Sequence, residues 1–326
     1  MNNISVIVVN WNGKHFLADC FDSLRKQNYP SFSVILVDNG SVDGSADFVS
    51  QQYPEVHLIR LKNNLGFCAA NNIAIRSANT PYIALLNNDT IVHPMWLENL
   101  HRGLMFNSQA GFAASKMLFY DYPEIIDRAG DGYTTAATGL LRGRNQSAKH
   151  FSTPEYIFGA CAGAALYRTE MLRDVGLFDE DFFLVYEDVD LSFRAQLKGY
   201  TCIFVPDAIV YHKASGSIGH NSSISVYFSQ RNMEWVYIKN MPAGLFSRVL
   251  LNHFLYNIFA FFYFAAIGKS PDFIKAKWDA FKKIRKMTEK RKEIQKEKCV
   301  NNLYLRRLFY DESLISRLKS KIQHPR

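Results

Sequence analysis

The sequence predicts an α/β fold with a mostly parallel central sheet, and three observations lead to this prediction. Short apolar runs alternate with helical segments within residues 1–90, and turn residues bound each run. After about residue 247 the character changes to a long apolar segment and then a basic one. Alternating strands and helices are typical of βαβ units, whose strands run parallel. The C-terminal segments indicate a helical extension.

The N-terminal elements follow in order from the apolar periodicity. The expected strands are residues 4–9, 33–37, 56–61 and 82–86. The expected helices between them are residues 17–27, 46–52 and 69–78. Strand-like sequence returns at residues 201–206 and 209–211, after a less regular region. Small residues at 159–163 in that region indicate either close backbone approach to a ligand or strand, or simple tight packing.

Polar residues follow all four N-terminal strands. These strand ends read Asn10-Trp11-Asn12-Gly13, Asp38-Asn39-Gly40-Ser41, Lys62-Asn63-Asn64-Leu65-Gly66 and Asn87-Asn88-Asp89. Each one alone is consistent with an ordinary turn. Parallel sheets, however, bind their ligands at the carboxyl ends of the strands. The convergence therefore predicts a ligand site at this edge of the sheet.

The Asn87-Asn88-Asp89 segment has the residue types for a divalent cation. One carboxylate with neighbouring amides suits Mg²⁺ that already holds phosphate oxygens. His212 ends the strand-like run at 209–211, where a lone histidine is more often structural. An imidazole completes such a site only if the fold brings it to Asp89.

Residues 176–199 set carboxylates among aromatic and aliphatic side chains. Burying a carboxylate costs free energy unless a cation or hydrogen bond compensates it. One interpretation is a helix start, in which Asp188 or Asp190 caps the helix. The other is a catalytic carboxylate at the mouth of a site. Both interpretations stay open at the level of the residues.

Composition excludes several classes of protein. The chain has neither G-x-G-x-x-G after its first strand nor GxxxxGK[ST], which excludes a Rossmann dehydrogenase and a P-loop NTPase. Phosphate must then be held by a metal and side chains, so a diphosphate leaving group is expected. Five scattered cysteines without a CxxC pair favour a reducing compartment.

The net charge of +8 is confined to the C-terminal part. Residues 269–326 contain 18 Lys and Arg against 7 Asp and Glu, whereas residues 1–268 contain 20 against 23. This distribution argues against a nucleic-acid partner. Because residues 4–9 lack a basic flank, no signal peptide is expected, and the protein is expected to begin in the cytoplasm.

Two C-terminal segments predict attachment to a membrane. Residues 249–267 are almost continuously apolar, and their length is close to the ~20 residues that span a bilayer. Residues 275–298 read as a basic amphipathic helix with Trp278, Phe281, Ile284 and Met287 on one face. A solvated charged helix is the alternative. Polar breaks in the apolar segment favour interfacial attachment over a true span.

Six motifs in order then carry a family resemblance. They are VIVVNWNG at the start, VDNGSVDGS at 37–45, NNLGFCAANN at 63–72, LLNNDTIV at 85–92, the acidic run at 176–200, and VYH at 210–212. This order resembles family 2 glycosyltransferases of the GT-A fold, and within them the rhamnosyltransferase-like branch. The resemblance implies a GT-A domain over residues 1–240. It also implies a membrane-associating helical extension over residues 241–326.

The resemblance assigns roles to residues. It implies a nucleotide-sugar pocket formed by Asn10, Asn12, Asp38, Asn64, Gly66, Asn87 and Asn88. It makes Asp89 and His212 ligands of Mg²⁺ or Mn²⁺, with Asn87 at the position of the family's usual first acid. Asp188 corresponds to the catalytic base, and Glu187 stands beside it.

The implied activity is an inverting transfer of one sugar. The resemblance favours L-rhamnose from dTDP-rhamnose, moved onto a lipid-linked or polysaccharide acceptor in cell-surface glycan synthesis. Arg231 and Trp235 lie in a segment expected near the acceptor, but their order differs from the QxxRW motif of processive synthases. The expected location is peripheral, on the cytoplasmic face of the cell membrane. Alternatives are another UDP-, GDP- or dTDP-sugar donor, or a non-catalytic nucleotide-sugar-binding membrane scaffold.

Overall fold

The computed structural model describes residues 2–213 and 222–311, which form two compact units. Unit 1 comprises the described residues within 1–131, 141–195 and 200–217. Unit 2 comprises those within 132–140, 196–199 and 218–326. The expected boundary between residues 240 and 241 falls between two helices of unit 2 and stays a prediction as a functional division.

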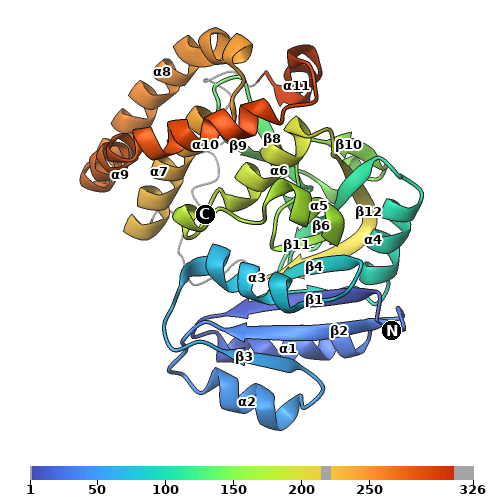
Figure 1. Cartoon of the computed structure of the whole chain (residues 1–326). Coiled ribbons are helices and arrows are strands. Elements are labelled where there is room, and N and C mark those ends of the chain that lie inside the picture. The colour runs from blue at the N-terminus through green and yellow to red at the C-terminus, as the bar shows by residue number, and fades with distance from the viewer. Residues whose placement is uncertain (1, 214–221, 312–326) are drawn as a thin grey trace. The chain divides into compact units, whose positions relative to one another are not determined.

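The first half of unit 1 is the predicted set of βαβ units. Its strands are β1 (Ile4–Asn10), β2 (Phe32–Asp38), β3 (His57–Arg60) and β4 (Tyr82–Asn87). The helices between them are α1 (Lys14–Arg25), α2 (Ser45–Gln52) and α3 (Gly66–Ser77). All pairings in the order β3-β2-β1-β4 are parallel, as Figure 1 shows. Asn10 is in register with Asp38, so the polar strand ends lie together.

The second half of unit 1 makes the sheet mixed. Its strands are β5 (Thr90–Val92), β6 (Ala110–Phe119), β7 (Ile126–Arg128), β10 (Glu155–Ile157), β11 (Ala164–Arg168) and β12 (Thr201–His212). The sheet order is β10-β12-β6-β11-β4-β1-β2-β3, with β11 antiparallel to both neighbours. The two strands expected at 201–206 and 209–211 are one strand with an irregularity between Val205 and Ile209. Pro206 lies there and has no N–H to donate.

Helices cover both faces of this sheet. The remaining ones in unit 1 are α4 (Trp96–Met105), the 3-10 turn η1 (Ala148–His150), α5 (Thr169–Val175), the 3-10 turn η2 (Glu180–Phe182) and α6 (Glu187–Leu197). Side chains from α1, α2 and α4 pack against alternate residues of β1, β2 and β4 in one apolar core. The buried indole of Trp96 donates a 2.8 Å hydrogen bond to Ser115, which satisfies its one polar atom.

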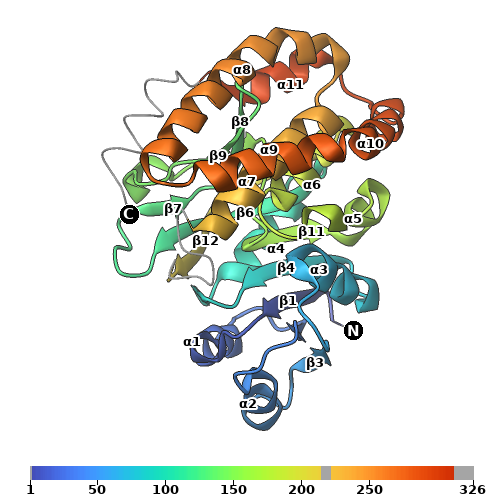
Figure 2. The same cartoon turned by 90° about the vertical axis from the view of Figure 1, so that its left-hand side faces the viewer.

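Unit 2 is mainly helical (Figure 2). Its helices are α7 (Ser223–Asn240), α8 (Ala243–Ala266), α9 (Ser270–Lys282), α10 (Ile284–Lys296) and α11 (Asn302–Leu308). A small sheet of order β13-β8-β9 joins β8 (Asp131–Thr134), β9 (Gly139–Leu141) and β13 (Phe309–Tyr310). The apolar segment predicted at 249–267 lies within α8, apart from its last residue.

The prediction of one amphipathic helix over 275–298 is wrong. The chain leaves the helical conformation at Lys283, and two helices result. Arg291 and Gln295 of α10 donate hydrogen bonds to backbone carbonyls of α7, so packing against α7 sets the direction of α10. Met287 is fully buried, whereas Trp278 and Phe281 are exposed, so these residues do not share one face. No Pro or Gly marks the break, which is why the sequence pattern does not predict it.

The contact between α4 and β12 gives a stability prediction. A Cβ added at Gly103 would lie 2.6 Å from Cγ2 of Val205. Gly103→Ala is therefore expected to lower the free energy of unfolding by about 1–3 kcal/mol through overpacking, despite better helix propensity. Urea unfolding measures this. In a Val205→Ala background the same substitution is expected to be neutral or stabilising, and equal losses in both backgrounds would contradict the packing argument.

Candidate active site

Asn10 connects the ends of three parallel strands. Its amide nitrogen donates 3.2 Å hydrogen bonds to Oδ1 of Asp38 and to Oγ of Ser41. Its Oδ1 accepts a 2.7 Å hydrogen bond from Asn88. Asn10 and Asp38 are both buried, and the second Asp38 oxygen accepts from the Ser41 backbone. Asp38 thus fixes the turn beside the site, and its direct contact with a nucleotide stays a prediction.

The neighbouring turns are held by amide side chains. Asn12 adopts a left-handed backbone with φ 51°, and its Oδ1 accepts a 2.8 Å hydrogen bond from the Val42 backbone. Asn64 accepts hydrogen bonds from Asn39 at 3.0 Å and from the Gly66 backbone at 2.9 Å. A Cβ on Gly66 would lie 2.4 Å from the Phe183 ring, so glycine is required there. These contacts pre-form the turns at the strand ends.

Asp89 and His212 come together at the same edge of the sheet. The distance from His212 Nε2 to Asp89 Oδ1 is 3.3 Å. The other ring nitrogen, Nδ1, lies 2.8 Å from Oδ2 of Asp127. Arg144 pairs with the opposite oxygen of Asp127. Asp89–His212–Asp127 therefore form one connected, largely buried chain of charges.

The pKa values of this chain follow from its contacts. Burial acts to lower the pKa of His212, but hydrogen bonds to Asp127 and Asp89 outweigh it and raise the pKa to about 9. Burial likewise acts to raise the pKa of Asp127. The hydrogen bond to His212 and the charge of Arg144 outweigh it and lower that pKa to about 2. Without a metal, His212 is thus held as a cation between two carboxylates.

These residues fit a divalent cation as a partial ligand set. Metal-binding histidines commonly use their second nitrogen to contact a carboxylate, as His212 does with Asp127. That contact leaves Nε2 directed at Asp89. Within residues 2–213 and 222–311, no group of three or more His, Cys, Asp or Glu side chains is arranged to hold a metal. Asp89 and His212 would therefore need ligands from the substrate and from water.

A second buried cluster surrounds Asp188. Arg128 Nη1 lies 3.6 Å from Asp188 Oδ2 and 3.3 Å from Asp131 Oδ1. Burial raises the pKa of Asp131 to about 8, which Arg128 opposes and the charge of Asp188 reinforces. Burial and the charge of Asp188 also raise the pKa of Glu187 well above its ordinary value. Burial thus disfavours the ionised forms of Asp131 and Glu187, and Arg128 is the cation beside Asp131 and Asp188.

The hydrogen bonding of three polar atoms distinguishes this cluster. Arg128 Nε, Asp131 Oδ2 and Glu187 Oε2 are buried without a hydrogen-bond partner among the described residues. Buried polar atoms in folded proteins are normally hydrogen-bonded, so such atoms call for an explanation. A polar ligand or ordered water at this cluster would satisfy them.

The backbone before Asp188 is strained. Phe183, Val185 and Tyr186 adopt left-handed φ angles of 67°, 65° and 72°, which are costly for residues with large side chains. Helix α6 then begins at Glu187. Asp188 lies in the first turn of α6, where a carboxylate is favoured by the helix dipole. The helix-start interpretation is thus compatible with a role for Asp188 in the site.

The other acids of the run have structural contacts. Asp190 pairs with Arg194 at 2.9 Å inside α6. Glu180 accepts a hydrogen bond from Asn72 at 2.9 Å. Only Asp188 and Glu187 of this run belong to the second cluster.

The small residues at 159–163 allow close approach of neighbouring elements. A Cβ on Gly163 would lie 2.8 Å from the Asn87 amide.

Sequence reasoning missed Asp127, Arg128 and Asp131. They lie in the segment Ile126-Asp127-Arg128-Ala129-Gly130-Asp131, where charged residues alternate with small and apolar ones. This concentration of charged residues beside apolar ones is the sequence feature that could have indicated a site. The residues expected near the acceptor, Arg231 and Trp235, lie in unit 2. There they are buried, and the Arg231 guanidinium stacks 4.1 Å from the Trp235 ring.

Solved structures of known function share this fold. The mannosyltransferase PcManGT of Pyrobaculum calidifontis, solved with GDP-Man and Mn²⁺, matches with a TM-score of 0.56 and 17% identity over 90% of this chain and 85% of its own. TarS 1–349 of S. aureus, solved with UDP, matches with a TM-score of 0.54 and 18% identity over 91% and 90%. Both are similar in fold. At this level of identity the likeness defines the class of fold, which is the GT-A fold.

Sequence comparison identifies the family within this class. Residues 5–176 match the sequence profile of glycosyl transferase family 2. The N-acetylglucosaminyl-diphospho-decaprenol L-rhamnosyltransferase of Mycobacterium tuberculosis is 26% identical over 71% of this chain and 86% of its own length. The chain belongs to glycosyl transferase family 2, and it resembles the rhamnosyltransferases within it.

The raised pKa of Asp131 predicts a pH-dependent stability. Between about pH 4 and pH 8 the unfolded chain has lost this proton and the folded chain keeps it, so Asp131 lowers stability by up to about 1.4 kcal/mol per pH unit. Asp131→Asn removes this cost. The stability gain of the variant over the natural chain is expected to widen from pH 5 to pH 8 in thermal melts. A stability difference between Asp131→Asn and the natural chain that stays constant from pH 5 to pH 8 would contradict the assignment.

Proposed function

We propose that this glycosyltransferase moves L-rhamnose from dTDP-rhamnose onto a lipid-linked glycan acceptor, with inversion at the anomeric carbon. The Mycobacterium tuberculosis relative supports this proposal, since its name describes rhamnosyl transfer to a diphospho-decaprenol-linked sugar. The observation that carries the chemistry is the pair of buried clusters around Asp89 and Asp188, linked by the adjacent residues Asp127 and Arg128.

The strand-end turns are the proposed donor pocket. Asn12, Asn64, Asn87 and Asn88 are at least partly exposed and offer amide groups to a base, ribose or phosphate. Asn10, Asp38 and Gly66 are buried and shape the turns that carry them. Pre-formed turns lower the entropy cost of donor binding. Nothing in these side chains reads one sugar ring, so the sugar assignment rests on the relative.

Asp89 and His212 are the proposed ligands of Mg²⁺ or Mn²⁺, which would supply charge stabilisation of the diphosphate leaving group. Binding through Nε2 requires His212 to lose the proton that Asp89 and Asp127 favour. Asp127 would then hold the ring orientation. A single carboxylate matches the low number of protein carboxylates that Mg²⁺ uses beside substrate phosphates.

Asp188 is the proposed catalytic base. It accepts the proton of the acceptor hydroxyl as that oxygen forms its bond to the anomeric carbon, while the bond from that carbon to the diphosphate oxygen breaks. Arg128 Nη1 lies 3.6 Å from Asp188 Oδ2 and places a positive charge beside the proposed base. Glu187 is proposed to position Asp188. One displacement of this kind inverts the anomeric centre.

The acceptor is proposed to be lipid-linked and to be used at the cytoplasmic face of the membrane. The apolar and basic composition of unit 2 supports this location. Arg231 and Trp235 are kept as proposed contributors on the acceptor side. Their mutual stacking inside unit 2 favours a role in holding the shape of α7 over direct contact.

Donor choice is testable by ligand-induced stabilisation. At about 100 times its Kd, a donor adds about 2.7 kcal/mol to the stability of the folded state. In the presence of Mn²⁺, dTDP-rhamnose is expected to raise the melting temperature more than UDP- or GDP-sugars. Chelation of the metal or Asp89→Asn is expected to reduce the shift. A larger shift with a UDP- or GDP-sugar would overturn the donor proposal, while the assignment to glycosyl transferase family 2 would stand.

Replacing the proposed base separates binding from chemistry. Asp188→Asn is expected to lower turnover by at least about 10²-fold, because general-base catalysis supplies about that much, with donor affinity within a few-fold. Rhamnosyl transfer to a lipid-linked acceptor and donor-induced melting shifts measure the two effects. The exposed Glu170→Gln on α5 is the matched control and keeps full activity. Turnover that survives Asp188→Asn would rule out this residue as the base.

A further inference from the structure

Helix α8 has one face packed into unit 2 along its length. Leu245, Val249, His253, Ala260 and Phe264 recur on that face and are buried. The His253 ring contacts the Ala136 carbonyl at 2.9 Å and the Glu234 carboxylate at 3.0 Å. By length and composition alone, α8 could cross a membrane, with a mean hydropathy of 1.5. The contacts of His253 with Glu234 of α7 and with the Ala136 carbonyl hold that face of α8 against protein, which favours an orientation in the membrane plane over a span.

The opposite face of α8 is apolar and exposed. Leu251, Phe254, Ile258 and Phe262 lie at helical spacing and are between 38% and 65% exposed. Helix α9 carries a similar stripe of Ile274, Trp278 and Phe281, each more than half exposed. Exposed apolar stripes of this kind are typical of interaction sites. We name these two stripes the α8–α9 face.

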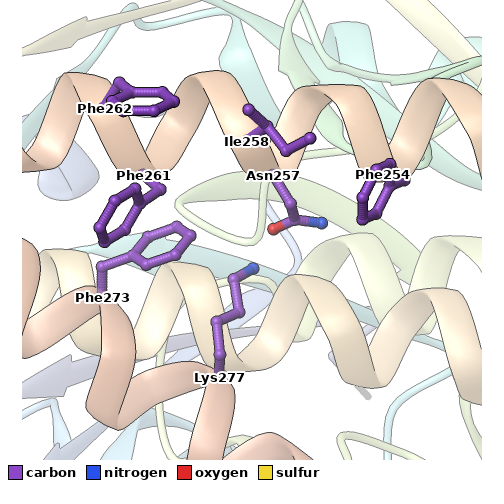
Figure 3. Close-up of a pocket in the computed structure, with 7 residues that line it drawn as sticks. All are labelled: Phe254, Asn257, Ile258, Phe261, Phe262, Phe273 and Lys277. Atoms are coloured by element: carbon purple, nitrogen blue, oxygen red, sulfur yellow. The ribbon is translucent and has the colours of Figure 1, made fainter.

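A groove of about 410 Å³ lies between the two helices. It is lined by Phe254, Asn257, Ile258, Phe261 and Phe262 of α8, and by Phe273 and Lys277 of α9 (Figure 3). The rings of Phe261 and Phe273 are neighbours with centroids 5.9 Å apart, and their planes are tilted by 59°. The groove is shallow and open to the surface.

The groove suits a hydrocarbon chain. Its one cationic group, Lys277, is neutralised by Glu234 at 2.6 Å and also donates to the Gln230 carbonyl. No net charge is therefore left to bind a phosphate within the groove. Phenylalanine rings supply most of the wall, and such a wall gains free energy by removing an apolar chain from water.

Basic residues predominate around the α9 part of the α8–α9 face. Lys275 and Lys282 are more than half exposed and both pair with Asp279, and the exposed Arg285 pairs with Glu289. Residues 269–298 nevertheless contain 12 Lys and Arg against 5 Asp and Glu, so the segment keeps a positive excess. The Lys282 ammonium lies 5.6 Å from the Trp278 ring. Basic residues beside inserted aromatics favour an anionic membrane surface. A second copy of the chain is disfavoured as the occupant, because its face would bring like charges together.

We propose that the α8–α9 face docks onto an anionic phospholipid bilayer with α8 in the membrane plane, and that the groove takes one lipid acyl chain. This inference deepens the proposed membrane location and does not depend on the donor or on Asp188. Failure of the test below therefore leaves the transfer chemistry intact.

Flotation of the full-length protein with preformed vesicles tests the docking. Vesicles of phosphatidylglycerol and phosphatidylcholine in equal parts are expected to bind the protein at least about tenfold better than phosphatidylcholine alone. Replacing Phe262 and Trp278 together by serine is expected to lower the partition coefficient at least about tenfold, since both lose membrane burial. The matched control Phe106→Ser removes an aromatic that is 82% exposed in unit 1, and it is expected to bind normally.

A phosphatidylglycerol with a diazirine on its acyl chain tests the groove. After illumination, mass spectrometry is expected to find crosslinks within residues 254–277. Alkaline carbonate is expected to release the bound protein, as for an in-plane attachment. Unchanged flotation of the double variant or equal binding to uncharged vesicles overturns the docking proposal. Crosslinks confined to other residues would show that the groove does not take the acyl chain. Resistance to carbonate would overturn the in-plane orientation.

Discussion

Two adjacent residues, Asp127 and Arg128, hold both halves of the site. Asp127 fixes the ring of His212 next to Asp89, and Arg128 supplies the cation beside Asp131 and Asp188. Buried charges are tolerated only when they are compensated, so each cluster depends on its partner from this pair. A displacement of strand β7 would move the two clusters together. The short strand thus couples the proposed leaving-group side of the reaction to the proposed base.

The sequence predicted the parts of the site that follow directly from strand ends. Parallel register places Asn10 beside Asp38 and Asn87 beside Val9, so local patterns were sufficient for the fold and the amide-rich turns. The role of Asp188 was predicted from the family resemblance of the acidic run at 176–200. Asp127 and Arg128 could not be assigned in this way, because His212 and Asp188, which connect them to the site, lie tens of residues away. The helix break at Lys283 could not be predicted either, because it depends on the packing of α10 against α7.

The strained stretch before α6 gives Asp188 a defined position at an energetic cost. Residues 183, 185 and 186 stay in left-handed conformations because surrounding packing outweighs their strain. Phe183 also contacts Gly66, and its carbonyl accepts a hydrogen bond from the Cys68 backbone. The start of α3 and the approach to α6 are therefore tied together. Phe183 therefore helps to position both the turn after β3 and the segment that leads to Asp188.

The place of β11 in the sheet has a consequence for synthesis of the chain. Strand β4 is complete at residue 87, but its outer edge is covered only when β11 arrives at residues 164–168. At the usual pace of translation this interval lasts roughly 4–16 s. During that time an apolar strand presents unpaired backbone groups, which are templates for aggregation. Nascent or truncated chains that end before β11 are therefore expected to aggregate more readily than the finished protein.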